Sequence, residues 1–469
     1  MSIFKTLATT AIALTLTTAA MRGQASSGSL GLSESASVSA MAVRVRDGKV
    51  LAKHDAQRRL TPASLTKAFT TGMAMRELGP AARLATVFGL RRHDGGSDIV
   101  VHGSFDPTIG SRYFGGVNLS VLADSVVERL HAAGVERIEN LEIDLSLSPV
   151  QTYGGCRLWE DIGNGYGAIP SVVMDADNEV SLYFNTSVAE GGECRLDSIV
   201  PAIESDLRPR VDVTAYSGNQ DKSNVFIADS ALWLVTGQLP VGRKAFGVKA
   251  VVPSPELTFA RRLARQLEAR GVKTSRVRTA ESPAKDSTIF VHYSPTIAEI
   301  AKQTNTHSLN HFADALTLHV STQGGQQRAS WDVAGSELAK YWKSNAAINP
   351  LFRDGSGLAP YNAVSASDVV AMLKTMKKSR EWAEYKATLP RLGIEGTWSG
   401  LGRNTDIAGK VRAKSGSMTG VVSYGGVLTL ANGDEVLFAV IVNHFEESPY
   451  DVKKRIVQWL LNIYKTHHQ

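Results

Sequence analysis

The fold is constrained above all by a change in the spacing of apolar residues, which is helical at both ends of the chain and strand-like between them. Apolar residues with helical spacing mark the segments before about residue 85 and after about residue 288. The intervening region instead carries short alternating strands separated by Gly, Asp and Asn, with only two clear helices. The last part returns to strands and contains an apolar hairpin joined by Asn432-Gly433. We therefore predict an α/β unit that is interrupted by a β-rich region and then completed.

The composition restricts the class of protein. Of the 469 residues, 43% are hydrophobic and 20% are charged, which is typical of globular chains of two or three domains. The net charge of +6 is a mild excess and forms no basic block, so it gives no reason to expect nucleic acid as a partner. No stretch of about 20 apolar residues is present, so we predict no transmembrane anchor.

The first 25 residues have the pattern of a secretory signal peptide. Lys5 precedes an apolar stretch over residues 7–16, and small residues follow up to Ala25. Cleavage is expected near Ala20 or Ala25, and removal of residues 1–25 would take away Lys5 and Arg22 and lower the net charge from +6 to +4. We therefore predict export and begin the folded part after residue 25.

Two cysteines, Cys156 and Cys194, lie 38 positions apart. An even, low number in an oxidising compartment favours one disulfide between them, and two free thiols are the alternative. Their spacing does not suggest a metal site.

A serine and a lysine three positions apart, Ser64 and Lys67, form the first candidate motif. The same pattern occurs at Ser2–Lys5, inside the predicted signal, and at Ser282–Lys285, in a predicted loop. Only Ser64 precedes a run with helical periodicity, which predicts an amphipathic helix from Ser64 to about residue 79. Positions i and i+3 of a helix share a face, so Lys67 can reach the Ser64 hydroxyl.

Two further motifs follow in order. Ser308-Leu309-Asn310 lies within the predicted helical region, and Ser217-Gly218-Asn219 has the same pattern in the β-rich part. Lys414-Ser415-Gly416 lies on a predicted strand, and this type of tripeptide occurs nowhere else in the chain. Each motif alone has an ordinary structural explanation, such as a helix cap or a solvated lysine. The three together, in this order and on these elements, are typical of penicillin-recognising acyl transferases.

Each motif residue has a chemical role in such a site. Ser64 is the predicted nucleophile, and Lys67 can activate it only as a neutral amine. Its pKa must therefore fall by about 3 units, through burial and a nearby positive charge that we assign to Lys414. Ser308 is expected to relay a proton to the leaving amine, and Asn310 to hold both Lys67 and the substrate amide.

The strand motif is expected to bind the substrate. Lys414, aided by Ser415, would hold a terminal carboxylate. Gly416 would let the strand approach the substrate without a side chain in the way. The backbone N–H groups of Ser64 and Ser417 would form the oxyanion hole.

On these motifs the chain resembles the D-alanyl-D-alanine carboxypeptidase/endopeptidase family, the low-molecular-mass class C penicillin-binding proteins of the penicillin-binding protein 4 type. The 244 positions between Ser64 and Ser308 support this, because single-domain serine β-lactamases place the two motifs much closer. The resemblance covers nearly the whole mature chain. Further matching stretches are Phe105–Gly110, Leu158–Ala168, Phe246–Val272, Asp354–Leu358 and Leu389–Thr397.

The resemblance implies a fold and a division of the chain. The expected fold class is α/β (α+β), with a serine β-lactamase/transpeptidase-like domain whose antiparallel sheet is flanked by helices, interrupted by two smaller β-rich domains. The expected segments are a signal peptide, 1–25; the catalytic domain, 26–90 and 286–469; inserted domain II, 91–165 and 250–285; and inserted domain III, 166–249.

The resemblance also implies an activity. It suggests a periplasmic serine D,D-peptidase that hydrolyses peptidoglycan stem peptides through an acyl-enzyme, takes β-lactam antibiotics as covalent inhibitors and needs no cofactor. Asp161 would meet the free amino group of the peptide's diamino acid, as an aspartate in the matching segment does in similar enzymes. The oligomeric state does not follow from the sequence.

Other interpretations stay open at this point. A β-lactamase would share the acylation step, although the large insertion argues against it. A scaffold that kept the fold without catalysis is a second alternative, and the complete set of motif residues argues against decay. His307 and His311 have the spacing of a zinc pair, but no glutamate follows the first, so we expect no metal.

Overall fold

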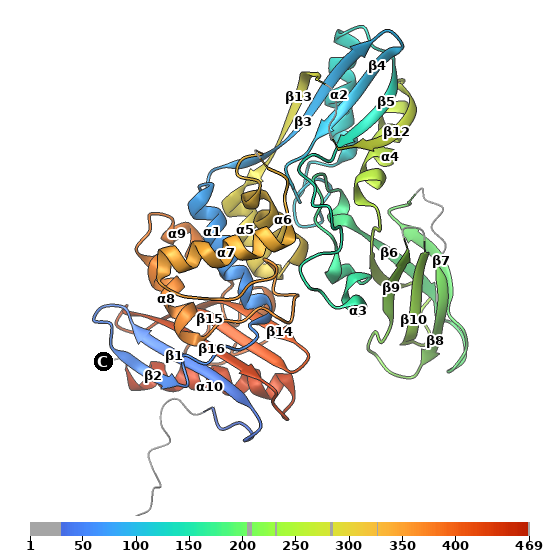
Figure 1. The fold of residues 1–469 in the computed structure, drawn as a ribbon. Coiled ribbons are helices and arrows are strands. Elements are labelled where there is room, and N and C mark those ends of the chain that lie inside the picture. Colours follow the sequence, from blue (N-terminus) through green and yellow to red (C-terminus); the bar gives the residue numbers. More distant parts are fainter. Residues whose placement is uncertain (1–29, 204–208, 230–231, 282–284, 326, 468–469) are drawn as a thin grey trace, which may run out of the picture.

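The computed structural model describes residues 30–203, 209–229, 232–281, 285–325 and 327–467. The predicted signal peptide, 1–25, lies outside these ranges. The described residues form four sheets, two of five strands and two of three, together with ten α-helices (Figure 1). None of the helices in these ranges combines the length and the apolarity that a membrane span requires.

One five-stranded sheet is built from the two ends of the chain. Its order is β14-β15-β16-β1-β2, and every neighbouring pair is antiparallel. β15 and β16 are buried on both faces, because alternate side chains enter two different hydrophobic cores. The strands are β1 (Ser37–Arg44), β2 (Val50–His54), β14 (Val411–Met418), β15 (Val421–Thr429) and β16 (Glu435–Asn443).

Helices cover both faces of this sheet. α10 (Pro449–Thr466) packs on one face, and the remaining helices of this part form a layer on the other (Figure 1). That layer contains α1 (Thr66–Glu77), α5 (Ile297–His307), α6 (Asn310–Ser321), α7 (Trp331–Ala346), α8 (Ala366–Lys377) and α9 (Trp382–Thr388). The predicted antiparallel sheet flanked by helices is confirmed.

The helix after Ser64 differs from its prediction. The periodicity predicts an amphipathic helix from Ser64, but a 3-10 turn (Ala63–Leu65) precedes α1, and every residue from Thr66 to Met75 is buried. α1 lies in the centre of the helical layer, where neighbours surround it on all sides. Its threonines pair with backbone carbonyls, which is how polar residues stay satisfied there.

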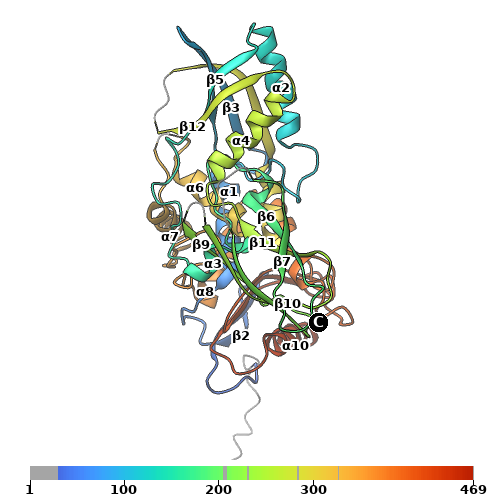
Figure 2. The ribbon, with the colours of Figure 1, turned by 90° about the vertical axis from the view of Figure 1, so that its right-hand side faces the viewer.

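The second five-stranded sheet is formed by residues of the interruption and its two edges. Its order is β12-β5-β4-β3-β13, with α2 (Leu119–Ala132) and α4 (Pro255–Glu268) packed on it (Figure 2). The chain leaves the helical layer through β3 and returns through β13, and the two strands pair with each other. The strands are β3 (Arg83–His93), β4 (Gly96–His102), β5 (Arg137–Asp144), β12 (Lys273–Ala280) and β13 (Ser287–Thr296).

The two three-stranded sheets share one hydrophobic core. Their orders are β8-β10-β9 and β11-β6-β7, and Trp233 and Phe184 are fully buried between them. The strands are β6 (Glu179–Asn185), β7 (Arg195–Val200), β8 (Arg210–Tyr216), β9 (Asn224–Asp229), β10 (Leu232–Pro240) and β11 (Phe246–Val251). The short helix α3 (Trp159–Ile162) precedes them and contacts β9.

The expected disulfide is wrong, because both cysteines are free thiols. Cys194 is buried in the core of the small sheets, where its backbone N–H donates to the Val213 carbonyl. Cys156 is exposed, and its neighbour Arg157 is paired with Asp314 of α6. The two thiols are therefore held by different parts of the molecule, a constraint that their sequence spacing does not reveal.

Candidate active site

Ser64 lies on a tight turn at the start of α1. The residue before it, Ala63, has a left-handed φ of 47°, which costs about 1–2 kcal/mol for a residue with a side chain. The Thr66 hydroxyl donates to the Ala63 carbonyl and helps to hold this turn. Ser64 itself is half-buried.

Lys67 has three polar neighbours and no contact with solvent. Its Nζ lies 2.8 Å from Ser64 Oγ, 2.6 Å from Asn310 Oδ1 and 2.6 Å from the Ser356 carbonyl oxygen. A neutral amine has two N–H donors and one lone pair. The amide oxygen and the carbonyl can only accept, so they take the two donors and the lone pair faces the Ser64 hydroxyl.

The electrostatic surroundings favour this neutral form. Burial lowers the pKa of Lys67 to about 7, the carboxylates of Asp314 and Asp354 oppose that change, and the Arg157 cation adds to it. The sequence analysis assigns the added positive charge to Lys414. Lys414 does interact with Lys67, since the Lys67 charge lowers the pKa of Lys414, and Arg157 is a further cation that the sequence does not single out.

Ser308 and Lys414 contact each other. Ser308 lies between α5 and α6 with a left-handed φ of 59°, and its Oγ accepts from Lys414 Nζ at 3.0 Å. Lys414 also donates to the Ser415 carbonyl at 2.7 Å. Burial and the nearby Lys67 charge lower the pKa of Lys414 well below its usual range.

Gly416 brings β14 against the turn that carries Ser64. A Cβ atom at this position would lie 2.2 Å from the Pro62 carbonyl oxygen and 2.4 Å from Ser423 Oγ. The sequence predicts that the missing side chain leaves room for substrate. The atoms closest to the missing side chain of Gly416 instead belong to the protein itself. The next residue, Ser417, is exposed.

The segment around Asp161 reaches the second motif through Tyr166. The Tyr166 hydroxyl donates to Asp161 Oδ1 at 3.0 Å, and the Tyr166 carbonyl accepts from Asn310 Nδ2 at 2.7 Å. Partial burial raises the pKa of the Asp161 carboxyl. Asp161 is therefore connected to the site through this tyrosine and Asn310.

A cavity of about 490 Å³ opens beside the second motif. Ser308 and Asn310 line it from the helical layer, and Arg112, Glu179 and Lys249 line it from the interruption. Both regions of the chain therefore contribute to the surface next to the motif residues.

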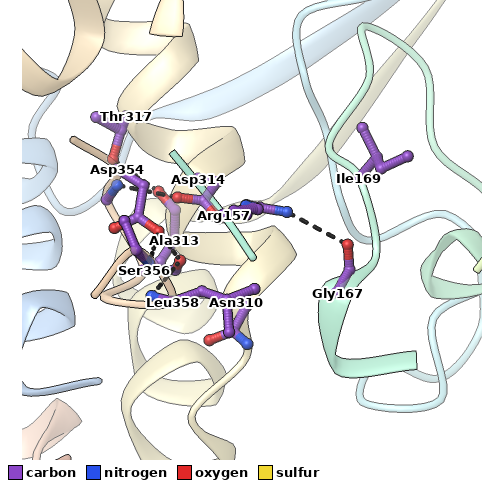
Figure 3. A network of polar contacts seen from close by, with 12 residues as sticks. Arg157, Gly167, Ile169, Asn310, Ala313, Asp314, Thr317, Asp354, Ser356 and Leu358 are labelled. Atoms are coloured by element: carbon purple, nitrogen blue, oxygen red, sulfur yellow. Dashed lines mark hydrogen bonds and ion pairs between the residues drawn. The ribbon is translucent and has the colours of Figure 1, made fainter. Parts of the chain in front are cut away.

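Two polar residues that support the site are not predicted from the sequence. The Thr397 hydroxyl lies 2.6 Å from the Ser415 hydroxyl, and Arg157 forms a buried ion pair with Asp314 (Figure 3). Thr397 ends a stretch that carries only the family resemblance. No local pattern singles out Arg157, because its partner is 157 positions away in the chain.

Comparisons with known proteins identify the family of the chain. A model of the D-Ala-D-Ala carboxypeptidase 3 (S13) family matches residues 30–463. The chain is similar to the D-alanyl-D-alanine carboxypeptidase DacB of Haemophilus influenzae, with 23% identity over 447 residues, 92% of this chain and 91% of the relative. It is also similar to the D-alanyl-D-alanine carboxypeptidase of Actinomadura sp. strain R39, with 26% identity over 87% of this chain and 78% of the relative.

A solved structure has the same fold. The crystal structure of penicillin binding protein 4 (dacB) from Haemophilus influenzae superposes with a TM-score of 0.79 at 22% identity, covering 93% of this chain and 98% of the other. The family match extends across both the interrupted α/β part and the interruption itself. The chain therefore belongs to the D-Ala-D-Ala carboxypeptidase 3 (S13) family, the penicillin-binding protein 4 type that its three motifs predict.

Proposed function

We propose that this member of the family is a serine D-Ala-D-Ala carboxypeptidase and D,D-endopeptidase that works through an acyl-enzyme on Ser64. The observation that carries the proposal is the contact between Ser64 Oγ and a buried lysine amine whose two other partners are acceptors. This arrangement directs the lone pair of neutral Lys67 at the hydroxyl proton. A serine in such a contact is prepared for attack on a carbonyl carbon.

Acylation follows from the positions of these groups. Lys67 takes the hydroxyl proton while Ser64 Oγ bonds to the carbonyl carbon of the penultimate D-alanine. The backbone N–H groups of Ser64 and Ser417 would stabilise the oxyanion. When the C–N bond breaks, the proton that Lys67 took would pass to the leaving amine through the Ser308 hydroxyl, which Lys414 contacts, and Lys67 would be neutral again. Water then hydrolyses the ester, which returns Ser64 to its free form.

Lys414 and Ser415 would bind the carboxylate of the terminal D-alanine. In the free enzyme, burial disfavours a proton on Lys414, and a bound carboxylate would reverse that preference by ion pairing. Thr397 would orient the Ser415 hydroxyl. The two buried lysines would then have different roles, because Lys67 acts as the neutral base and Lys414 as the cation next to substrate.

The outer edge of β14 offers a place for an extended peptide. β14 is the last strand of its sheet, and β15 pairs with only one of its edges. Residues 390–392 cover part of the other edge through backbone hydrogen bonds to Val411 and Ala413. Ser415 and Ser417 follow on the same edge, so a stem peptide could pair there by strand addition.

The remaining roles belong to the same proposal. Asp161 would bind the free ammonium group of the diamino acid, and the endopeptidase reaction would use the same site on a cross-linked peptide. β-Lactam antibiotics would acylate Ser64 and remain attached. Penicillin binding protein 4 (dacB) from Haemophilus influenzae has been solved in complex with a novel β-lactam. That complex supports the proposal that this chain also binds β-lactams.

We also propose the domain division and the location. The catalytic domain would comprise 26–90 and 286–469, with inserted domains at 91–165 with 250–285 and at 166–249. The proposed boundaries near residues 90 and 286 fall at the paired strands β3 and β13, where the chain crosses between sheets. A substrate in the cell wall fits export by the predicted signal peptide and action in the periplasm.

The test is release of D-alanine from a soluble peptide that ends in D-Ala-D-Ala. We expect turnover by the native enzyme, none above background with Ser64→Ala, and native turnover with the control Ser282→Ala, which alters the second Ser–x–x–Lys pattern of the mature sequence. Turnover that survives Ser64→Ala would refute the nucleophile. Absence of turnover together with rapid hydrolysis of a penicillin would instead favour a β-lactamase.

A further inference from the structure

Arg157 is a buried cation that enters the helical layer from the interruption. It lies just before α3, and its guanidinium pairs with Asp314 of α6; the two side chains are 3% and 0% exposed. The guanidinium also lies over the Trp331 ring, 5.0 Å from the ring centroid. Figure 3 shows Arg157 between Asp314 on one side and the loop that contains Gly167 on the other.

One contact path leads from Arg157 through Asp314 to Lys67. Asp314 Oδ1 accepts from the Gly355 N–H at 2.9 Å, and the next residue, Ser356, gives its carbonyl to Lys67. Gly355 packs so closely on α6 that a Cβ there would lie 1.8 Å from Thr317 Oγ1. The turn that supplies one acceptor for Lys67 is therefore held against α6 at Asp314.

A second path leads through Gly167. Arg157 Nη1 donates to the Gly167 carbonyl at 3.3 Å. The neighbouring Tyr166 carbonyl accepts from Asn310 Nδ2, and Asn310 Oδ1 is the other acceptor for Lys67. Asn310 is thus oriented by the same loop that Arg157 contacts.

We propose that Arg157 is a positioning residue that fixes both acceptors of Lys67, Asn310 through Gly167 and Ser356 through Asp314. This inference rests on the proposed function, in which Lys67 is the base. It assigns part of the catalytic geometry to a residue from the interruption, outside all three motifs. Arg157 acts through these neighbours rather than on Ser64 or the proposed substrate.

The charged groups around Lys67 also support a role for Arg157. Asp314 from α6, Asp354 from the turn that contains Ser356 and Lys414 from β14 are the other titratable groups near its amine. Arg157 offsets the carboxylate of Asp314, which would otherwise favour protonated Lys67. Loss of the Arg157 charge would favour uptake of a proton by Lys67 and Asp314 together.

A purely structural role would not need this chemistry. Among the described residues, the buried Nε of Arg157 has no hydrogen-bond partner, which is a cost to folding. A buried ion pair can often be replaced by apolar side chains with no loss of stability. The charge and the two contacts therefore have a better explanation in the state of Lys67 than in stability alone.

The experiment compares the pH profile for acylation by a fluorescent penicillin among Arg157→Met, Arg157→Lys and the native enzyme. In Arg157→Met, we expect the pH at which the acylation rate rises to increase by about one unit. The acylation rate should then be about tenfold lower at neutral pH and should return to the native value at alkaline pH. Arg157→Lys keeps the charge and should keep the pH at which the rate rises near its native value. Arg157→Gln, which retains N–H donors for Asp314, makes the same test if Arg157→Met does not fold.

The control is Arg262→Met, which breaks a comparable arginine–aspartate pair with Asp175 outside the site. It should leave the pH at which the rate rises unchanged. An equal loss of rate at every pH, or no change, in Arg157→Met and Arg157→Gln would overturn the inference while the proposed function stands. A native enzyme that forms no Ser64-dependent adduct would overturn the proposed function itself.

Discussion

The two walls of the site are held in different ways. The β14 wall, residues 411–418, pairs with β15 along its whole length. The inserted wall, residues 157–167, contains only a four-residue helix and a 3-10 turn, and side chains fix it to the helical layer. A wall held by backbone pairing accepts many different side chains, except where another segment packs directly against its backbone. A wall held by side chains depends on a few polar contacts.

The largest expected effect is steric and falls on the β14 wall. Gly416→Ala would place Cβ 2.2 Å from the Pro62 carbonyl oxygen, so the strand or the Ser64 turn must move. A misplacement of about 1 Å can cost about 100-fold in rate. We therefore expect a loss of at least about 100-fold in penicillin acylation, measured as the second-order rate. Gly400→Ala, where a Cβ meets no atom within 4 Å, is the control. A native rate in Gly416→Ala would contradict the tight contact.

Lys67 lies between the two walls and should determine the pH dependence. Its pKa of about 7 means that protonation removes the base as the pH falls below neutrality. We expect the acylation rate to fall about tenfold for each unit below about pH 7 and to level off above it. Stopped-flow acylation across this range measures this dependence. A rate that is flat from about pH 5 to about pH 8 would exclude Lys67 as the neutral base.

On the inserted wall, the expected effect depends on the substrate. Asp161→Asn removes the carboxylate that we assign to the ammonium group, so kcat/KM for amino-bearing peptides should fall about tenfold. The same peptides with the amine acetylated, and penicillin, should react at native rates. Because the pKa of Asp161 is raised, the preference for the free amine should also weaken as the pH falls and the carboxyl gains a proton. Equal losses on both peptides would show that Asp161 serves the structure of the wall instead.

The smallest expected effect concerns Thr397, which supports β14 from outside. Thr397→Val preserves the shape and removes one hydrogen bond to Ser415. We expect about a threefold rise in KM for D-Ala-D-Ala peptides, with kcat nearly unchanged. Thr405→Val, which removes a hydroxyl that donates to the nearby Gly402 carbonyl, is the matched control. A large loss of kcat would place Thr397 closer to the reaction than we infer.

The same contrast explains what the sequence can predict. Ser64, Lys67, Ser308, Asn310 and Lys414 are recognisable because each lies in a short motif on a predictable element. The structure brings them together through hydrogen bonds across up to 243 positions. The α/β class is also predictable, since the helical periodicity and the strand alternation are local.

The sequence predictions fail where residues from distant parts of the chain contact one another. Arg157 and Thr397 have no local signature, because their partners come from other elements. The periodicity after Ser64 suggests an exposed face, but tertiary packing buries α1 on all sides. The even number of cysteines and the predicted export favour a disulfide, while the fold holds Cys156 and Cys194 in separate places.

The most direct test of the central claim is the intact mass of the purified protein after incubation with benzylpenicillin, beside Ser64→Ala. With Ser64 as the nucleophile, we expect a stable adduct of one drug on the native protein and none on the variant. An adduct that persists in Ser64→Ala, or the absence of any adduct on the native protein, would contradict this role of Ser64.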